Sequence, residues 1–366
     1  MIATQDMAAR IGAKCETGLG KFIGDTYGRK WFLLMLAALI IMNITTIGAD
    51  LAGIAAALQL ITGIHFRWFI LPVSLLIIAI QIFWSYRVFA RYMKYLTLIL
   101  FAYVIDGFLA KPDWGTVLKN IILPHITWSR GSLAVMVGLL GTTISPYMLF
   151  WQASQELEEV KQEKNGKKTE SAFSVKSNSV RLFDTAVGMI YSNIVAFFII
   201  LSSAATLNRH GITIQTASDA ASALRPIAGD FAYVLFAVGI IGSGLIAIPV
   251  LAGSTAYPLS EWRGCPEGLD QPVNRAKCFY TILTASVLVG VLIAYLPINP
   301  IDALFYSQVL MGLLTPVVLT MLVLVTSNKE IMGAEDVNKP FFSIFGWISV
   351  FIIAVSGAAL IWTLVT

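Results

Sequence analysis

One stretch inside an apolar segment combines hydroxyl side chains with a proline, at Gly141–Phe150 ("GTTISPYMLF"). Pro146 has no backbone N–H, and its ring clashes with the carbonyl group of Thr142, four residues earlier. The residue before the proline, Ser145, is driven toward an extended conformation. We therefore expect the helix to break here and to release the carbonyls of Thr142 and Thr143. Together with the Ser145 hydroxyl, these are hard oxygen ligands suited to a cation.

The same residues are also consistent with a simple proline kink, in which the Thr and Ser hydroxyls bond to their own helix. Within lipid, released carbonyls are tolerated only where they are buried in protein or line a wet cavity. Discontinuous helices of this kind form ion sites in many secondary transporters. The motif alone leaves both interpretations open.

Two more polar side chains lie within apolar segments. Gln308 is an uncharged amide shortly before a second local break at Thr315–Pro316; it could offer its oxygen to the same cavity or bond to a neighbouring helix. Asp50 is an intramembrane carboxylate, which is costly and marks a functional site by default. Proton relay or attraction of a cation fits Asp50, and pairing with a buried basic group is the alternative.

The composition identifies the setting of these residues as a membrane. Of the 366 residues 57% are hydrophobic and 13% are charged, whereas soluble domains carry about 25% charged residues. The chain is therefore expected to be an all-α integral membrane protein. Its three cysteines and three histidines form neither a disulfide pattern nor a zinc motif, and we expect no cofactor and no nucleic-acid partner.

An enzyme is not expected either. Hydrolysis with Ser145 as the nucleophile needs a general base within reach, and His65, His125 and His210 all fall near the ends of the expected spans.

A membrane span needs about 20 apolar residues, and the chain has nine such segments, at 31–62, 67–86, 94–110, 132–155, 182–207, 230–258, 277–297, 301–326 and 343–365. They divide the chain into an amphipathic N-terminal part (1–30, the end of a helix plus a link), four spans (31–155), a charged loop (156–181) and five spans (182–366). Asp106, at the end of the third span, is expected to meet water.

Basic residues set the expected orientation, because loops rich in Lys and Arg stay cytoplasmic. Most of the 25 Lys and Arg residues fall on the side of the N-terminus. We therefore predict a multi-pass protein of the plasma membrane with a cytoplasmic N-terminus and a cytoplasmic loop 156–181. That loop could bind a protein partner of unknown identity, or serve as a solvated linker.

Four segments of the chain resemble the Nramp family of divalent metal-ion transporters. "GTTISPYMLFWQASQELEE" is similar to the family's sixth helix, "GADLAGIAAALQL" to the third, and "LFYSQVLMGLLTPVVL" to the tenth, while "SEWRGCPEGLDQPVNRAKCFY" resembles the link between helices eight and nine. The resemblance implies a LeuT-like fold of two inverted five-helix repeats. It also implies a metal site between broken helices one and six that works by alternating access.

Residue by residue, the resemblance places the carbonyl of Thr142 and the side chain of Ser145 at metal-ligand positions. Gln308 matches a glutamine that completes the site, and Asp50 matches an aspartate of the proton route. Tyr147 stands where the family has a histidine on that pathway. The metal ion is the substrate in this interpretation.

This chain departs from the family pattern at three points, and each changes what is expected of its metal transport. Ser145 replaces a methionine whose soft thioether favours transition metals, so selectivity should relax toward hard ions, Mg²⁺ and Mn²⁺ in particular. Tyr147 and Gly53 replace titratable residues, which weakens the case for proton coupling. No segment resembling the family's first helix precedes residue 1, so we expect either a truncated gene model or fragment of a longer protein, or a transport-inactive paralogue that acts as a membrane interaction protein.

Overall fold

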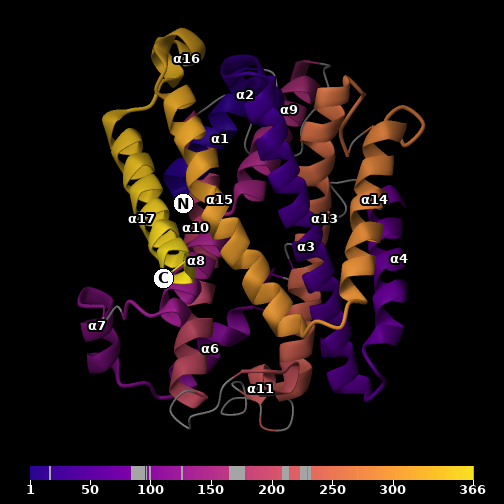
Figure 1. Ribbon diagram of the computed structural model, residues 1–366, viewed down its shortest axis with the longest axis vertical. Coiled ribbons are helices and arrows are strands. Elements are labelled where there is room, and N and C mark those ends of the chain that lie inside the picture. Colours follow the sequence, from indigo (N-terminus) through magenta and orange to yellow (C-terminus); the bar gives the residue numbers. More distant parts are fainter. Residues whose placement is uncertain are drawn as a thin grey trace.

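The computed structural model describes residues 1–15, 18–83, 95, 97–98, 100–124, 127–164, 178–207, 214–222, 229, 232–269 and 271–365. Within these ranges the regular structure is helical (Figure 1). The helices are α1 (Ile2–Cys15), α2 (Leu19–Tyr27), α3 (Arg29–Thr62), α4 (Arg67–Phe83), α6 (Phe101–Leu109), α7 (Trp114–Ile122), α8 (Arg130–Thr143), α9 (Pro146–Lys164), α10 (Asn178–Thr206), α11 (Ala217–Ser222), α13 (Ala232–Arg263), α14 (Lys277–Ala294), α15 (Pro300–Thr326), α16 (Lys329–Asp336) and α17 (Pro340–Val365).

Seven of the nine expected spans are confirmed as helices long and apolar enough to cross a membrane. The expected span 67–86 is represented by α4, a shorter apolar helix of 17 residues. The expected span 94–110 lies partly outside the described residues, and its second half forms α6. Helix α9 continues to Lys164 and so covers the first part of the segment 156–181 that was predicted as a loop; residues 165–177 lie outside the described ranges.

Local sequence signals set the ends of the longest spans. Helix α15 begins at Pro300, a residue whose fixed φ suits the first helical position, and the Asn299 side chain accepts a hydrogen bond from the Ile301 N–H. Helix α3 ends at Thr62 and is capped by Gly63, which adopts a left-handed conformation (φ 74°) and donates its N–H to the Gln59 carbonyl. A residue without a Cβ takes this conformation at no steric cost.

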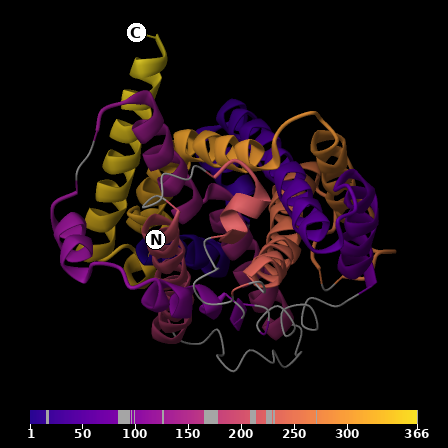
Figure 2. The same ribbon diagram turned by 90° about the horizontal axis from the view of Figure 1, so that it is seen from below.

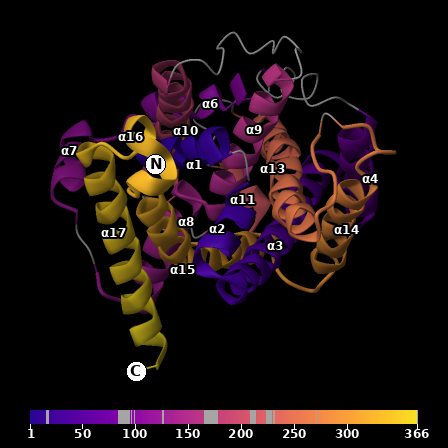
Figure 3. The same cartoon turned by 90° about the horizontal axis from the view of Figure 1, so that it is seen from above.

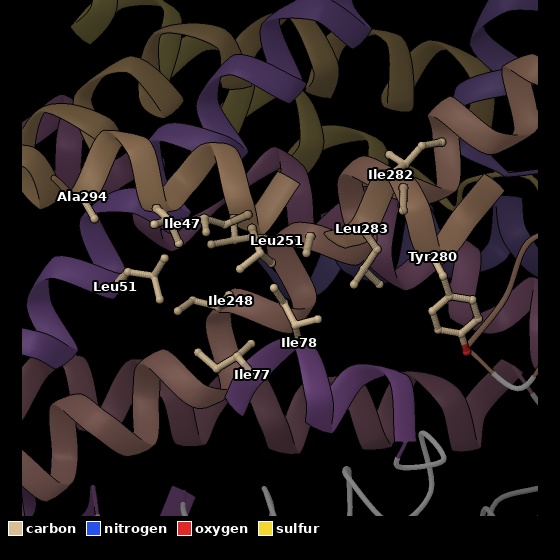
Figure 4. Close-up of a cluster of buried hydrophobic side chains, with 14 of the residues drawn as sticks. Ile47, Leu51, Ile77, Ile78, Ile248, Leu251, Tyr280, Ile282, Leu283 and Ala294 are labelled. Carbon is tan, nitrogen blue, oxygen red and sulfur yellow. The ribbon is translucent and has the colours of Figure 1, made fainter. Parts of the chain in front are cut away.

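The helices pack into one bundle, and two large apolar clusters lie at its centre. The first joins α3, α4, α13 and α14, and Figure 4 shows Leu51, Ile77, Ile248 and Leu283 converging from these four helices. The second joins α1, α9 and α15 with residues of α2, α3, α16 and α17. Figures 2 and 3 place α17 at one edge of the bundle and α4 with α14 at the opposite edge.

Helix α1 lies inside the bundle rather than on its surface, since Figures 1 and 3 both show it among the other helices. Met7 and Ile11 are completely buried. The buried Arg10 forms an ion pair with Asp6 (Nε–Oδ2 2.8 Å) and donates to the Asp336 carbonyl (2.7 Å). Of the charges in the segment predicted to be amphipathic, Asp6 and Arg10 are therefore buried as a pair, whereas Lys14 and Lys21 stay exposed.

Candidate metal-ion site

The predicted helix break is present. Helix α8 ends at Thr143 and α9 begins at Pro146, with Ile144 and Ser145 between them in non-helical conformation. The Ser145 hydroxyl lies 3.0 Å from the Gly141 carbonyl oxygen and 2.9 Å from that of Thr142. The proline thus separates the two half-helices, and the serine hydroxyl partly satisfies the carbonyls that the break releases.

The break faces a neighbouring helix at very short range. A Cβ atom at Gly141 would overlap the Gln308 carbonyl oxygen and the Gly312 backbone of α15, and one at Gly312 would overlap the Val137 carbonyl oxygen of α8. Glycine at both positions therefore lets the backbones of α8 and α15 approach closely. This approach places Thr142 and Gln308 at the same cavity.

The cavity has a volume of about 230 Å³ and lies between α3, α8, α9, α13 and α15. Four of the five residues predicted from the sequence contribute to its wall: Asp50, Thr142, Tyr147 and Gln308. The remaining lining residues are Thr46, Gly53, Ile240, Ser243, Gly244, Ala247, Leu251 and Leu304. Side chains from distant parts of the sequence thus meet at one cavity.

The fifth predicted residue, Ser145, is placed differently from the expectation. Its side chain is 3% exposed and does not belong to the cavity wall. The physical reason is the proline break itself, because the hydroxyl donates back to the helix that Pro146 interrupts. In this structure the side chain of Ser145 holds the break, and Thr142 reaches the cavity.

Two buried oxygen atoms of α3 lining the cavity lack a hydrogen-bond partner among the described residues. They are Oγ1 of Thr46 and Oδ2 of Asp50. Buried polar atoms are nearly always satisfied, and an unsatisfied one in a native fold requires an explanation such as a ligand or water. Thr46 was not singled out from the sequence, although its spacing of four residues from Asp50 puts both on one helix face.

The cavity offers no group of three or more His, Cys, Asp or Glu side chains, and no such group occurs elsewhere in the described part of the chain. Its polar wall consists of one carboxylate (Asp50), one amide (Gln308) and hydroxyl groups, as well as any backbone carbonyl left free at the break. Every donor in this set is an oxygen apart from the amide nitrogen. Such a set suits a hard divalent cation that retains part of its water shell.

Comparison with known proteins matches residues 1–363 to the family model "Natural resistance-associated macrophage protein-like" (Nramp). This chain belongs to the Nramp family. Its curated relatives include the "Divalent metal cation transporter MntH" of Deinococcus radiodurans, 27% identical over 98% of this chain and 79% of the relative. The protein of the same description from Caldanaerobacter subterraneus subsp. tengcongensis is 26% identical over 99% of this chain and 83% of the relative.

A solved structure supports the fold. The crystal structure of the Eremococcus coleocola manganese transporter in complex with an aromatic bis-isothiourea substituted compound aligns with a TM-score of 0.74 and 19% sequence identity. The alignment covers 97% of this chain and 76% of that one. The resemblance noted in the four sequence motifs and the expected LeuT-like all-α membrane fold are therefore confirmed.

Within this Nramp fold, Tyr147 links the cavity to two neighbouring elements. Its side chain lines the cavity together with Asp50 of α3 and packs on the apolar cluster that joins α3 and α13. Its backbone carbonyl accepts a hydrogen bond from the Ser254 hydroxyl of α13 (3.0 Å). The first turn of α9 is thus fixed against α3 and α13 at the level of the cavity.

A larger cavity of about 760 Å³ adjoins the Nramp chain's central cavity on the side of α11. The two share Gly53, Ile240 and Leu304 in their walls. At the opposite end of α13, the Tyr257 hydroxyl donates to Glu158 of α9 (2.7 Å), and Glu158 also accepts from the Leu269 N–H (3.0 Å). The central cavity therefore adjoins a vestibule at one end, while hydrogen bonds join α9 to α13 at the other.

The expectation that Asp106 is exposed to water is wrong. The residue is fully buried, and its carboxylate accepts a hydrogen bond from Ser202 of α10. The packing of α6 against α10 removes it from solvent, and it does not line the central cavity of this Nramp chain.

Proposed function

We propose that this chain moves divalent metal cations across the membrane as a secondary transporter working by alternating access, with a preference for hard ions such as Mg²⁺ and Mn²⁺. The relatives described as divalent metal cation transporters support the substrate class. The structure described as a manganese transporter supports Mn²⁺ as one candidate ion.

The observation that carries the proposal is the cavity at the α8–α9 break. It joins one carboxylate, Asp50, to oxygen donors from four other helices and leaves the Asp50 and Thr46 oxygens unpartnered among the described residues. A cation would satisfy both. Mg²⁺ is commonly held by one or two carboxylates with several waters, and 230 Å³ is room for roughly seven water molecules at about 30 Å³ each.

We assign a role to each predicted residue in this proposal. Asp50 supplies the negative charge that draws the cation into the membrane, and Thr142 and Gln308 supply neutral oxygen ligands. Tyr147 lies beside Asp50 on the ion or proton pathway. Ser145 acts indirectly, since its hydroxyl orients the Thr142 carbonyl; the absence of a methionine thioether at this position leaves the cavity without a soft ligand.

In the proposed transport cycle the two ends of the cavity have different roles, because one adjoins the vestibule and the other is closed by hydrogen bonds between α9 and α13. The ion enters from the vestibule past Gly53, Ile240 and Leu304. Release on the other side requires α9 to separate from α13, which breaks the Tyr257–Glu158 hydrogen bond. By the distribution of basic residues the vestibule faces outside, and the N-terminus and segment 156–181 face the cytoplasm.

Ion flux into proteoliposomes tests the proposal. The protein, expressed from its natural gene, is reconstituted with a Mg²⁺- or Mn²⁺-sensitive dye inside the vesicles, and uptake is compared with that of Asp50→Asn. We expect the variant to lose about a hundredfold or more in apparent affinity, because a buried charge pair at short range contributes several kcal/mol. Asp302→Asn is the matched control, since Asp302 is an exposed carboxylate on α15.

The same flux measurement distinguishes the transporter from the alternative function, a membrane interaction protein. If the natural protein shows neither metal-dependent flux nor metal binding by calorimetry, the transporter proposal is wrong. A transport-inactive interaction protein acting through segment 156–181 would then be the better interpretation, and a partner captured by the full chain should be lost when that segment is deleted.

A further inference from the structure

Two cysteines lie where α13 ends and α14 begins. Cys265 is the second residue after α13, and Cys278 is the second residue of α14. Both thiols are free and partly exposed, and neither residue lines the central cavity or the vestibule. Their spacing in the sequence predicts no site, so it is the fold that brings them together.

The backbone of Cys265 is fixed by the cap of α13. Gly264 adopts a left-handed conformation (φ 66°). Its N–H donates to the Glu261 carbonyl (3.1 Å), and the Cys265 N–H donates to the Ser260 carbonyl (2.9 Å). This pair of bonds is a Schellman motif. Cys265 is therefore held to the end of α13 although it lies outside the helix.

Cys278 is held from the side of α14, which runs beside α13 (Figure 1). Its side chain packs on the apolar cluster shared by the two helices, and the ring of the next residue, Phe279, lies 4.8 Å from that of Tyr257 on α13. The Tyr280 hydroxyl donates to the Leu269 carbonyl (3.2 Å) of the connecting loop. Both cysteines thus have backbones fixed by regular structure.

The two thiols lie against each other. A hydrogen bond with the Cys278 thiol raises the pKa of Cys265, and the positive charge of Arg263 opposes this shift. The Cys265 thiol is therefore protonated at neutral pH and reacts through a small thiolate fraction. A partly exposed cysteine with a second thiol beside it is the arrangement in which oxidation leads to a disulfide.

We propose that Cys265 and Cys278 form a reversible disulfide and are a redox modification site of this protein. The distribution of basic residues predicts that this side of the protein is cytoplasmic. Disulfides in the cytoplasm are transient and respond to oxidants, because the compartment keeps thiols reduced. The pair is therefore expected to be reduced at rest and oxidised on exposure to a peroxide.

A peroxide accounts for every atom and electron of this step. The Cys265 sulfur attacks the peroxide, an S–O bond forms as the O–O bond breaks, and the leaving oxygen takes up a proton. The Cys278 sulfur then displaces the sulfenic oxygen as water, and the S–S bond forms. The two thiols lose two electrons and the peroxide gains them. Two small-molecule thiols reverse the reaction and become a disulfide themselves.

The disulfide would close the loop that contacts α9. Within this loop the Leu269 N–H donates to Glu158 of α9 (3.0 Å), and Glu158 also accepts from Tyr257 of α13 (2.7 Å). Oxidation should restrict the loop and so hold α9 against α13. This consequence rests on the proposed transport function, in which release of the ion requires these two helices to separate. We expect oxidation to slow metal uptake.

Peptide mapping of the purified full chain tests the pair directly. The protein is treated with hydrogen peroxide, its remaining thiols are alkylated, and it is digested with trypsin without a reductant. Trypsin cleaves after Arg263, Arg275 and Lys277, so the two cysteines fall in different peptides that only a disulfide can hold together. We expect the linked peptides in the oxidised protein and their loss after dithiothreitol.

Two serine variants are matched to this experiment. Cys278→Ser should abolish the linked peptides, and its metal uptake should no longer respond to peroxide. Cys15→Ser removes the third cysteine of the chain and should keep both the linked peptides and the response of uptake. Serine is close to cysteine in size, and metal uptake by the untreated variants shows that they fold.

Three results would overturn the disulfide. The natural protein could yield no linked peptides, Cys265 could be linked to Cys15 or to a second copy of the chain, or Zn²⁺ could protect both thiols from alkylation while peroxide links nothing, which would indicate a metal site. Linked peptides with unchanged uptake would refute the effect on α9. Absence of metal flux in the reduced protein would instead refute the transport function, and the linked peptides would still be read independently.

Discussion

Thr46 and Asp50 lie one turn apart on α3, and each directs into the central cavity an oxygen that has no hydrogen-bond partner among the described residues. Both atoms are buried, and burial without a partner costs about 1–3 kcal/mol for each group. The fold therefore maintains two destabilising groups side by side at the helix break. Such an arrangement is expected where a ligand supplies the missing interaction.

Because the Thr46 hydroxyl is unpartnered among the described residues of the metal-free protein, its removal should raise stability and lower metal affinity. Thr46→Val removes the unpartnered hydroxyl and keeps the side-chain shape, so the metal-free protein should become more stable by about 1 kcal/mol. The same change should weaken binding of Mg²⁺ or Mn²⁺, because one oxygen ligand is lost. Thermal unfolding without metal and calorimetric titration with metal measure the two effects.

Thr45→Val is the matched control for this experiment. Thr45 is the preceding residue of α3, and its hydroxyl already donates to the Ile41 carbonyl at 2.8 Å. The control should leave metal affinity unchanged. If Thr46→Val leaves metal affinity unchanged, the hydroxyl is not a ligand; if it lowers the stability of the metal-free protein, the hydroxyl is not unpartnered.

Ser145 offers a test of what holds the helix break. Ser145→Ala leaves the Gly141 and Thr142 carbonyls without the hydroxyl that bonds them, and we expect a loss of about 1–2 kcal/mol in the free energy of unfolding. Ser349→Ala serves as control, because Ser349 makes a similar bond to the carbonyl of Phe345 (2.9 Å) on an exposed, unbroken helix. Equal effects of the two changes on thermal stability would show that the break has no special need of the serine.

The sequence predicts those parts of the site that depend on local chemistry. Pro146 breaks a helix whatever its tertiary surroundings, and a carboxylate such as Asp50 is exceptional in any apolar segment. Both features were therefore predicted from the residues alone. The direction of the Ser145 hydroxyl was not, because a choice between the helix and the cavity is decided by one side-chain rotamer. The burial of Asp106 depends on the packing of α10, far away in the sequence.

The same reasoning explains why Ser243 and Thr46 were missed as cavity residues. Thr and Ser are frequent in membrane helices and commonly bond their own backbone, so the residue type carries little information. Their place in the cavity follows from how α3 and α13 face each other. A Cβ at Gly244 would collide with Ile54, which shows how closely the two helices approach.

The hydrogen bond between Tyr257 and Glu158 is predicted to keep the end of the cavity opposite the vestibule closed. Tyr257→Phe removes a donor at 2.7 Å and keeps the ring contacts with Trp151 and Phe279. Amide hydrogen exchange in the second half of α9 should become roughly fivefold faster, the factor that corresponds to about 1 kcal/mol. Tyr295→Phe is the control, since its hydroxyl bonds the Arg67 carbonyl elsewhere in the bundle. Unchanged amide exchange in α9 would show that the Tyr257–Glu158 hydrogen bond does not keep this end of the cavity closed.

The loop that follows α13 is expected to make the stability of the protein depend on pH. Burial raises the pKa of Glu267 to about 8, and the neighbouring carboxylates of Glu261 and Glu158 add to the shift while Lys161 and Lys21 oppose it. One Glu267 oxygen has no hydrogen-bond partner among the described residues, which is consistent with a group that is protonated in the folded protein.

The sign of the pH effect follows from the two states. The unfolded chain releases the Glu267 proton near its ordinary pKa of 4.5, and the folded chain releases it near 8. The folded state therefore holds the proton across this interval, and its stability falls as pH rises through it. Glu267→Gln, which cannot ionise, should flatten this part of the profile and be more stable than the natural protein above about pH 8. Thermal unfolding between pH 5 and pH 9 measures the difference, with the exposed Glu330→Gln as control. A Glu267→Gln profile parallel to that of the natural protein would show that this carboxyl is not the group that titrates.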